Sequence, residues 1–178
     1  MKWLDLSHNL FDGSISLEAL PERMEFLDVS DNKFCGVNLA SLPDTLKKTL
    51  IFSAYRNKLS GSVDLTRLPA ALVRLYLIDN QLSGPVVLTQ LPGNLKRLHL
   101  GDNQFNGSLD LTQLPPSLSE LILDNNAFSG TVDLSQLPQR LEKLYLSEND
   151  LSGEVFISHE LFDGVDVRNT KIIKRLIE

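Results

Sequence analysis

The sequence predicts a repeat solenoid, a curved β-arc with a parallel sheet on its concave side, short convex strands and little helix. Two observations predict this fold class. The first is an asparagine that recurs with spacings of 23, 25, 23, 23, 23 and 23 residues, at Asn9, Asn32, Asn57, Asn80, Asn103, Asn126 and Asn149. The second is a glycine four positions after each asparagine, at Gly13, Gly36, Gly61, Gly84, Gly107, Gly130 and Gly153. Such a period is typical of a solenoid, in which each coil is stable only against its neighbours.

Each repeat opens with a short strand that ends just before the asparagine. Leu98 and Leu100 lie on one face of such a strand and point into the coil, while His99 points outward. The chain turns at the asparagine and leaves backbone groups unpaired there. Because an amide both donates and accepts hydrogen bonds, a stack of asparagines can satisfy these groups coil by coil. The glycine supplies a backbone with positive φ or a close approach between coils.

The second half of each repeat is expected to run along the convex side. Apolar and polar residues alternate from Val132 to Ser135, which predicts a short strand there. Prolines at positions 69, 92, 115 and 138 end these segments and leave little room for a regular helix. One repeat is irregular, because three extra residues after Pro43 make Leu46, Leu50 and Phe52 compete for inward places. A bulge or small excursion is expected there.

The unit LxxLxLxxNxLSGxVDLTxLPxx is best preserved from Leu72 through Gly153 and resembles the leucine-rich repeat. Its glycine with the apolar segment that follows resembles the plant-type class of this repeat. Its VDLTxLP ending is most similar to leucine-rich repeat proteins of kinetoplastid protists. The resemblance covers nearly the whole chain and implies the curved fold, but this scaffold serves many unrelated binding tasks.

The two ends of the chain differ from the central repeats. We interpret residues 1–178 as a single domain of about seven to eight coils, in which 164–178 form a degenerate last coil with Thr170 in the asparagine position. The tail reads as a closing helix turn or as the lead into a further domain. Met1 enters directly at a leucine position, so an N-terminal cap is expected to be missing, and Trp3, Phe26 and Ile51 are expected to form an exposed apolar strip at that edge.

Composition narrows the classes of function. A formal net charge of -6 argues against nucleic-acid binding, which requires concentrated Lys and Arg. Because no apolar run approaches the ~20 residues that span a bilayer, no membrane insertion is expected. The start MKWLDLSHNL lacks the features of a secretory signal, and Cys35 is the only cysteine. Both features favour an intracellular compartment, although a trimmed secreted fragment would look the same.

The outward positions of the concave strands form columns, and these columns are the expected binding surface. Two central columns bring tyrosines and isoleucines together over consecutive coils, and tyrosine is favoured at interfaces. One flanking column is mainly basic and the other, which contains Asp79 and Asp102, is mainly acidic. The alternative is that β-propensity alone placed these residues. The residues expected to contact a protein or peptide are Tyr55, Arg74, Tyr76, Ile78, Arg97, His99, Glu120, Ile122, Lys143 and Tyr145.

The sequence therefore predicts a non-catalytic protein-interaction module without a cofactor or metal. Its histidines fall on different coils, and Cys35 lies beside a turn as a small half-buried residue. The row of acidic residues follows from repetition alone and does not predict a cation site. Two alternatives remain: a structural subunit that contacts its neighbours through the Trp3 edge, or the targeting domain of a larger enzyme such as a ubiquitin ligase or kinase.

Overall fold

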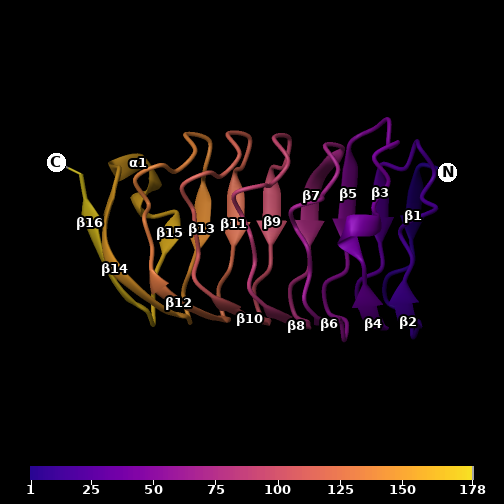
Figure 1. The fold of residues 1–178 in the computed structure, drawn as a ribbon, viewed down its shortest axis with the longest axis horizontal. Coiled ribbons are helices and arrows are strands. Elements are labelled where there is room, and N and C mark those ends of the chain that lie inside the picture. The colour runs from indigo at the N-terminus through magenta and orange to yellow at the C-terminus, as the bar shows by residue number, and fades with distance from the viewer. Residues whose placement is uncertain (178) are drawn as a thin grey trace.

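The structure, a computed structural model, describes residues 1–177 as a curved solenoid with its two ends far apart along the arc (Figure 1). One face is an eight-stranded sheet in which every neighbouring pair of strands is parallel. The strands follow chain order as β1 (Trp3–Asp5), β3 (Phe26–Asp28), β5 (Leu50–Ser53), β7 (Leu72–Tyr76), β9 (Arg97–His99), β11 (Glu120–Ile122), β13 (Lys143–Tyr145) and β15 (Val165–Asp166). The predicted fold class is confirmed.

A second layer of parallel strands forms where each coil leaves the concave sheet. Its larger sheet contains β6 (Ser60–Gly61), β8 (Gln81–Gly84), β10 (Gln104–Gly107), β12 (Ala127–Thr131), β14 (Asp150–Ile157) and β16 (Lys171–Leu176). A smaller sheet pairs β2 (Asp12–Ile15) with β4 (Lys33–Val37). Helical structure in residues 1–177 is confined to the 3-10 turn η1 (Leu39–Ser41) and the single turn α1 (His159–Phe162).

The second layer lies earlier in each repeat than the sequence indicated. Val132 and Leu134 are buried and Asp133 is exposed, as the alternation predicts, but β12 has already ended at Thr131. The carboxylate of Asp133 accepts the backbone N–H of Ser135 at 2.8 Å. This local turn withdraws the segment from strand pairing, because side-chain to backbone hydrogen bonds compete with the ladder.

The tail is a strand, and the expectation of a closing helix turn is wrong. Strand β16 pairs with β14 in continuous register from Ser152 opposite Lys171 to Ile157 opposite Leu176. Thr170 stands where the other coils carry asparagine; its hydroxyl donates to the carbonyl of Val167 at 2.6 Å. A neighbouring strand supplies more hydrogen bonds to this segment than one isolated helical turn could make.

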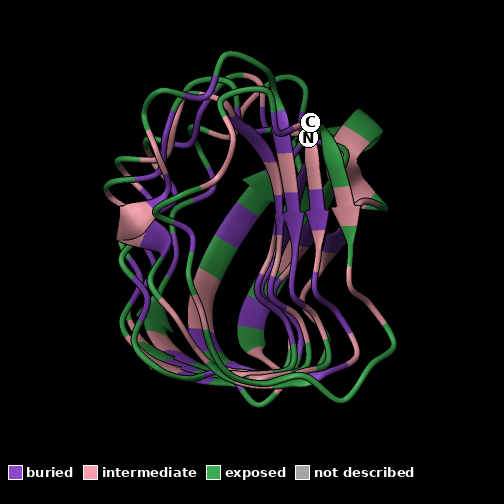
Figure 2. Cartoon of the chain, turned by 90° about the vertical axis from the view of Figure 1, so that its right-hand side faces the viewer, coloured by how far each residue is buried: buried purple, intermediate pink, exposed green. Residues whose placement is uncertain are grey.

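The core lies between the two layers, and buried and exposed residues alternate along the strands (Figure 2). Leu98 and Leu100 are fully buried, and the rings of Phe105 and Phe128 stack 6.2 Å apart between adjacent coils. The irregular repeat keeps all three of its apolar candidates inside, and the pairing of β5 with β7 shifts register between Leu50 and Ile51. The predicted bulge is therefore confirmed. The inward residues of this repeat are Leu46, Leu50 and Phe52.

The asparagines form a continuous ladder that joins each coil to the one before it. The Nδ2 group of Asn103 donates to the carbonyls of Leu77, Leu100 and Gly101 at 2.9, 3.1 and 3.0 Å. Its Oδ1 accepts the backbone N–H of Leu82 at 3.0 Å. The same pattern recurs at Asn32, Asn57, Asn80, Asn126 and Asn149.

The residue before each asparagine has a left-handed backbone, as Asp79 and Asp102 illustrate with φ of 57° and 51°. Most of the repeat glycines have the positive φ that was one of their two expected roles; Gly107, for example, has φ of 84°. Gly36 instead allows a close approach between coils, because a Cβ there would lie 2.7 Å from the hydroxyl oxygen of Ser14. The left-handed turns place a column of side chains along the edge of the concave face.

Replacing Asn103 by alanine should destabilise the solenoid by about 1–3 kcal/mol, because it leaves buried backbone groups of two coils without partners. Urea unfolding followed by circular dichroism measures this change. Asn106→Ala is the matched control, since Asn106 is exposed on β10 and should change the free energy of unfolding by less than about 0.5 kcal/mol. Equal stabilities of the two variants would contradict the role of the ladder.

Candidate functional site

The middle outward column of the concave sheet runs in register across the strands. Tyr76 pairs with His99, His99 with Ile122, and Ile122 with Tyr145. The imidazole of His99 meets the Tyr76 ring edge-on, with centroids 4.9 Å apart and an interplanar angle of 74°. These side chains therefore lie side by side, as the spacing of the repeats predicts.

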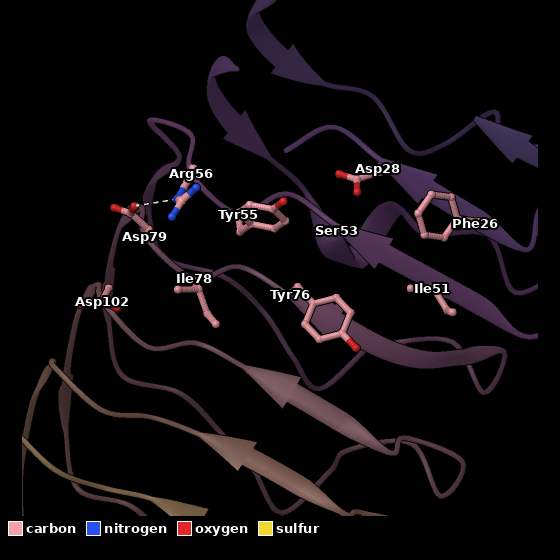
Figure 3. Close-up of a pocket in the computed structure, with 10 residues that line it drawn as sticks. All are labelled: Phe26, Asp28, Ile51, Ser53, Tyr55, Arg56, Tyr76, Ile78, Asp79 and Asp102. Atoms are coloured by element: carbon pink, nitrogen blue, oxygen red, sulfur yellow. Dashed lines mark ion pairs between the residues drawn. The ribbon is translucent and has the colours of Figure 1, made fainter. Parts of the chain in front are cut away.

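A hollow of about 590 Å³ opens in this face over strands β3, β5 and β7 and the turns that follow them. Aromatic and apolar side chains from successive coils point toward it (Figure 3). We define the apolar wall of the hollow as Phe26, Ile51, Tyr55, Tyr76 and Ile78, all half-buried. Its polar lining consists of Asp28, Ser53, Arg56, Asp79 and Asp102.

Ser53 explains why the hollow lies at this place. It occupies the middle column between Asp28 and Tyr76, where its small side chain is 4% exposed and its hydroxyl hydrogen-bonds that of Ser30 at 2.7 Å. A residue of this size leaves open space between its larger neighbours. The two serines also satisfy each other, so the floor of the hollow carries no unpaired hydroxyl.

The hollow gathers only part of the predicted binding set. Tyr55, Tyr76 and Ile78 line it, whereas the remaining predicted residues lie outside it. Phe26 and Ile51 were expected in an exposed edge strip with Trp3, and both also belong to the apolar wall of the hollow. The available signal was their column, which is apolar at Trp3, Phe26 and Ile51 and becomes charged from Arg74 onward.

Beyond the hollow, the expected basic column is interrupted by a buried carboxylate. Glu120 is only 7% exposed, and its Oε2 accepts a hydrogen bond from Nε2 of His99 at 2.9 Å. The same oxygen lies 3.5 Å from Nε of Arg97, and Oε1 lies 3.6 Å from Nζ of Lys143. Glu120 therefore neutralises part of the positive charge of this mainly basic column.

These contacts move both pKa values of the central pair downward. Burial by itself raises the pKa of Glu120, but Arg97, the hydrogen bond with His99 and Lys143 outweigh it and leave the pKa below its usual value. For His99, burial is the largest effect and lowers the pKa, although Glu120 opposes it by favouring the protonated ring. The pair is therefore a carboxylate next to a neutral imidazole near pH 7.

The other predicted residues are less available than the sequence indicated. Ile122 is 9% exposed and belongs to the packed surface of the sheet. Arg74 is half-buried, and its Nε is buried without a hydrogen-bond partner among residues 1–177. Tyr145 lies farther along the arc in a separate depression that Arg168 and Lys174 also line.

No three His, Cys, Asp or Glu side chains in residues 1–177 are grouped so that they could hold a metal ion. Cys35 is exposed, not half-buried as expected, and its thiol contacts the carbonyl of Gly13 at 3.4 Å, away from the concave sheet. No helix among the described residues is long and apolar enough to cross a membrane.

Comparison with known proteins identifies the fold. No protein family model and no curated protein matches the chain. The plant peptide hormone receptor RGFR1, in complex with RGF2, is 24% identical with a TM-score of 0.62, covering 97% of this chain and 36% of the receptor chain. A plant ice-binding protein is 21% identical with a TM-score of 0.60, covering 98% of this chain and 64% of that one.

These similarities confirm that the chain has the fold of the leucine-rich repeat solenoid. The chain spans about a third of the receptor and slightly less than two thirds of the ice-binding protein. Identity below a quarter shows shared fold and not shared function. The finer resemblance to kinetoplastid proteins stays a prediction.

Lowering the pH should destabilise the chain through His99. Its pKa in the folded chain lies below the value of 6.5 for a free imidazole, so the unfolded chain takes up a proton first as the pH falls. The contribution of His99 to the free energy of unfolding is fully present above pH 6.5. It is lost as the pH falls toward the pKa of His99 in the folded chain. Glu120 also destabilises the folded chain below pH 4.5, because its pKa in the folded chain lies below that value and the unfolded chain takes up the proton first.

Urea unfolding at about pH 7.5 and about pH 5.5 measures this contribution above the range in which carboxylates titrate. The decline in unfolding free energy should be smaller in His99→Gln than in the wild-type chain. His159→Gln is the matched control, because it removes an exposed histidine outside the site. An unchanged decline in His99→Gln would show that His99 is not the titrating group.

Proposed function

We propose that the chain is a non-catalytic recognition module that binds a protein segment or peptide on its concave face. The observation that supports this function best is the hollow of about 590 Å³ with its apolar wall. Its volume falls in the range of about 300–1,000 Å³ that is usual for binding pockets. The wall is aromatic and apolar while several carboxylates surround it, and this combination is typical of the core and rim of an interface.

The ligand is expected to lie along the arc and cross successive strands. The hollow extends over four coils, from Phe26 through Ile51 and Tyr76 to Asp102. Parallel strands lie about 4.8 Å apart, so this distance is roughly 14 Å and corresponds to about four extended residues. A peptide hormone receptor has a similar fold, and this similarity supports peptide recognition as the proposed role.

Peptides selected from a random display library on the wild-type chain should lose at least about tenfold in affinity, about 1.4 kcal/mol, for a Tyr76→Ala, Ile78→Ser double variant. Both side chains are half-buried on the open face, so the thermal midpoint should change little. Fluorescence anisotropy with the selected peptides measures the affinity.

The matched control for this test is Tyr145→Ala, which removes an equally half-buried tyrosine of the same column outside the hollow. Its affinity should stay within about threefold of the wild-type value. Selected peptides that bind the double variant as tightly as the wild-type chain would remove the concave face as the site. A larger effect at Tyr145 would move the site along the arc.

A second candidate function is assembly through the N-terminal edge. Trp3 on the outermost strand is 68% exposed and Leu10 is 77% exposed, next to the exposed Met1 and Phe11. Apolar side chains gathered on one edge of a sheet with unpaired backbone groups are typical of an association site. The chain would then be a structural subunit that contacts its neighbours through this edge.

Sedimentation velocity distinguishes this candidate from a monomeric recognition module. Under the assembly hypothesis the wild-type chain self-associates with increasing concentration, and a Trp3→Ser, Leu10→Ser variant stays monomeric because its edge is polar. Phe26 is left intact, since it also lines the hollow. A wild-type chain that remains monomeric at high concentration would argue against assembly through this edge.

A further inference from the structure

The charges around the hollow are strongly unequal. Its lining includes three carboxylates, Asp28, Asp79 and Asp102, and a single cation, Arg56. Asp5 lies beside Asp28 in register on the next strand and adds a fourth negative charge at that end. Arg74 is the nearest cation of the flanking column, but it does not line the hollow.

Arg56 offsets only part of this negative charge, because it is shared between Asp79 and Asp31, a carboxylate outside the lining. Its Nη1 lies 3.8 Å from Oδ1 of Asp31. Its Nε lies 3.7 Å from Oδ2 of Asp79, and Figure 3 shows this second pair. The guanidinium also approaches the face of the Tyr55 ring, 5.9 Å from the centroid. Arg56 therefore bridges two coils, while Asp28 and Asp102 form no ion pair within residues 1–177.

The phenol of Tyr55 responds to this field. Burial raises its pKa most, and the carboxylates of Asp31, Asp28 and Asp5 raise it further against the opposing effect of Arg56. Three carboxylates thus outweigh one guanidinium at the wall of the hollow. A negative potential beside an aromatic surface attracts a cation carried next to an apolar group, and tyrosine rings add to that attraction.

We propose that the hollow binds a peptide segment in which an apolar side chain stands next to lysine or arginine. The apolar side chain packs against Tyr55, Tyr76 and Ile78, and the cation reaches the carboxylates of Asp79 and Asp102. This inference rests on the proposed function and specifies the chemistry of its ligand. An organic cation fits better than a metal ion, because the carboxylates of residues 1–177 do not converge on one point.

Three labelled nine-residue peptides of glycine and serine test this chemistry, with Lys-Phe-Lys, Glu-Phe-Glu or Lys-Ser-Lys at the centre. Fluorescence anisotropy at low ionic strength should show the Lys-Phe-Lys peptide binding at least about tenfold more tightly than each of the others. The Lys-Ser-Lys peptide reports nonspecific attraction to a chain of net charge -6. Equal or tighter binding of Glu-Phe-Glu, or equal binding of Lys-Ser-Lys, would overturn the inference.

Substitutions in the protein test which carboxylates bind the cation of the peptide. An Asp79→Asn, Asp102→Asn double variant should weaken binding of the Lys-Phe-Lys peptide by about three- to tenfold and reduce its salt dependence. Asparagine keeps the left-handed backbone of these positions, as Asn125 already does in the same column. The matched control is Asp12→Asn with Asp44→Asn, which removes two exposed charges elsewhere and should change the affinity by less than twofold. Equal losses in both double variants would show nonspecific attraction and overturn the inference.

Different results would overturn this inference and the proposed function. If display-selected peptides bind through Tyr76 and Ile78 but carry acidic residues or no charge next to their apolar group, the ligand chemistry is wrong and concave-face recognition stands. If the selected peptides ignore these two residues and all three probes fail to bind, both the inference and the proposed function are wrong.

Discussion

The asparagine ladder is the constraint on which the rest of the structure depends. In each central coil one amide satisfies three carbonyls and one N–H group, and one of those carbonyls belongs to the preceding coil. The side-chain amide of Asn9 donates only to carbonyls of its own coil, at Leu6 and Ser7, because no described coil precedes it. The amides keep successive coils in the same register, and this register turns scattered residues into continuous columns.

The same regularity explains why the sequence predicts so much of the fold. Once the spacing of the asparagines is known, the partners across the sheet follow by counting, and Tyr76, His99 and Ile122 are neighbours as expected. The second layer was harder to predict, because alternating apolar residues mark burial and not strand pairing. Val132 and Leu134 are buried without forming a strand, since Asp133 ties up a backbone N–H that a ladder would need.

The site was predicted less completely, because a column gives the position of a residue and not the direction of its side chain. Glu120 was expected to contact a protein or peptide, yet it is 7% exposed and its carboxylate contacts His99, Arg97 and Lys143. The hollow depends on one small residue, Ser53, between larger ones. A repeat pattern does not show which outward position leaves space, because that space depends on the sizes of the neighbours on both adjacent coils.

The two halves of the concave face therefore differ in their local balance of charge, which the net charge of the chain does not reveal. Around Glu120 the cations are already paired, so a ligand there would have to displace existing contacts. Around the hollow, carboxylates exceed cations, and the half-buried aromatic wall still has exposed area. Within residues 1–177, Asp28 and Asp102 form no ion pair, so a ligand cation can approach them without breaking one. This difference favours the hollow over the centre of the sheet.

The acidic edge is by itself weak evidence for binding, because the backbone already favours it. The left-handed position before each repeat asparagine, and before Thr170 in the last coil, suits aspartate and asparagine. Five of its eight occurrences are Asp31, Asp79, Asp102, Asn125 and Asn169. Glu148 shares this edge but does not line the hollow, so its charge has no apolar wall beside it. Asp79 and Asp102 differ from the other acidic residues of the described edge because they line a hollow that also contains aromatic rings. The hollow is open there because Ser53 is small.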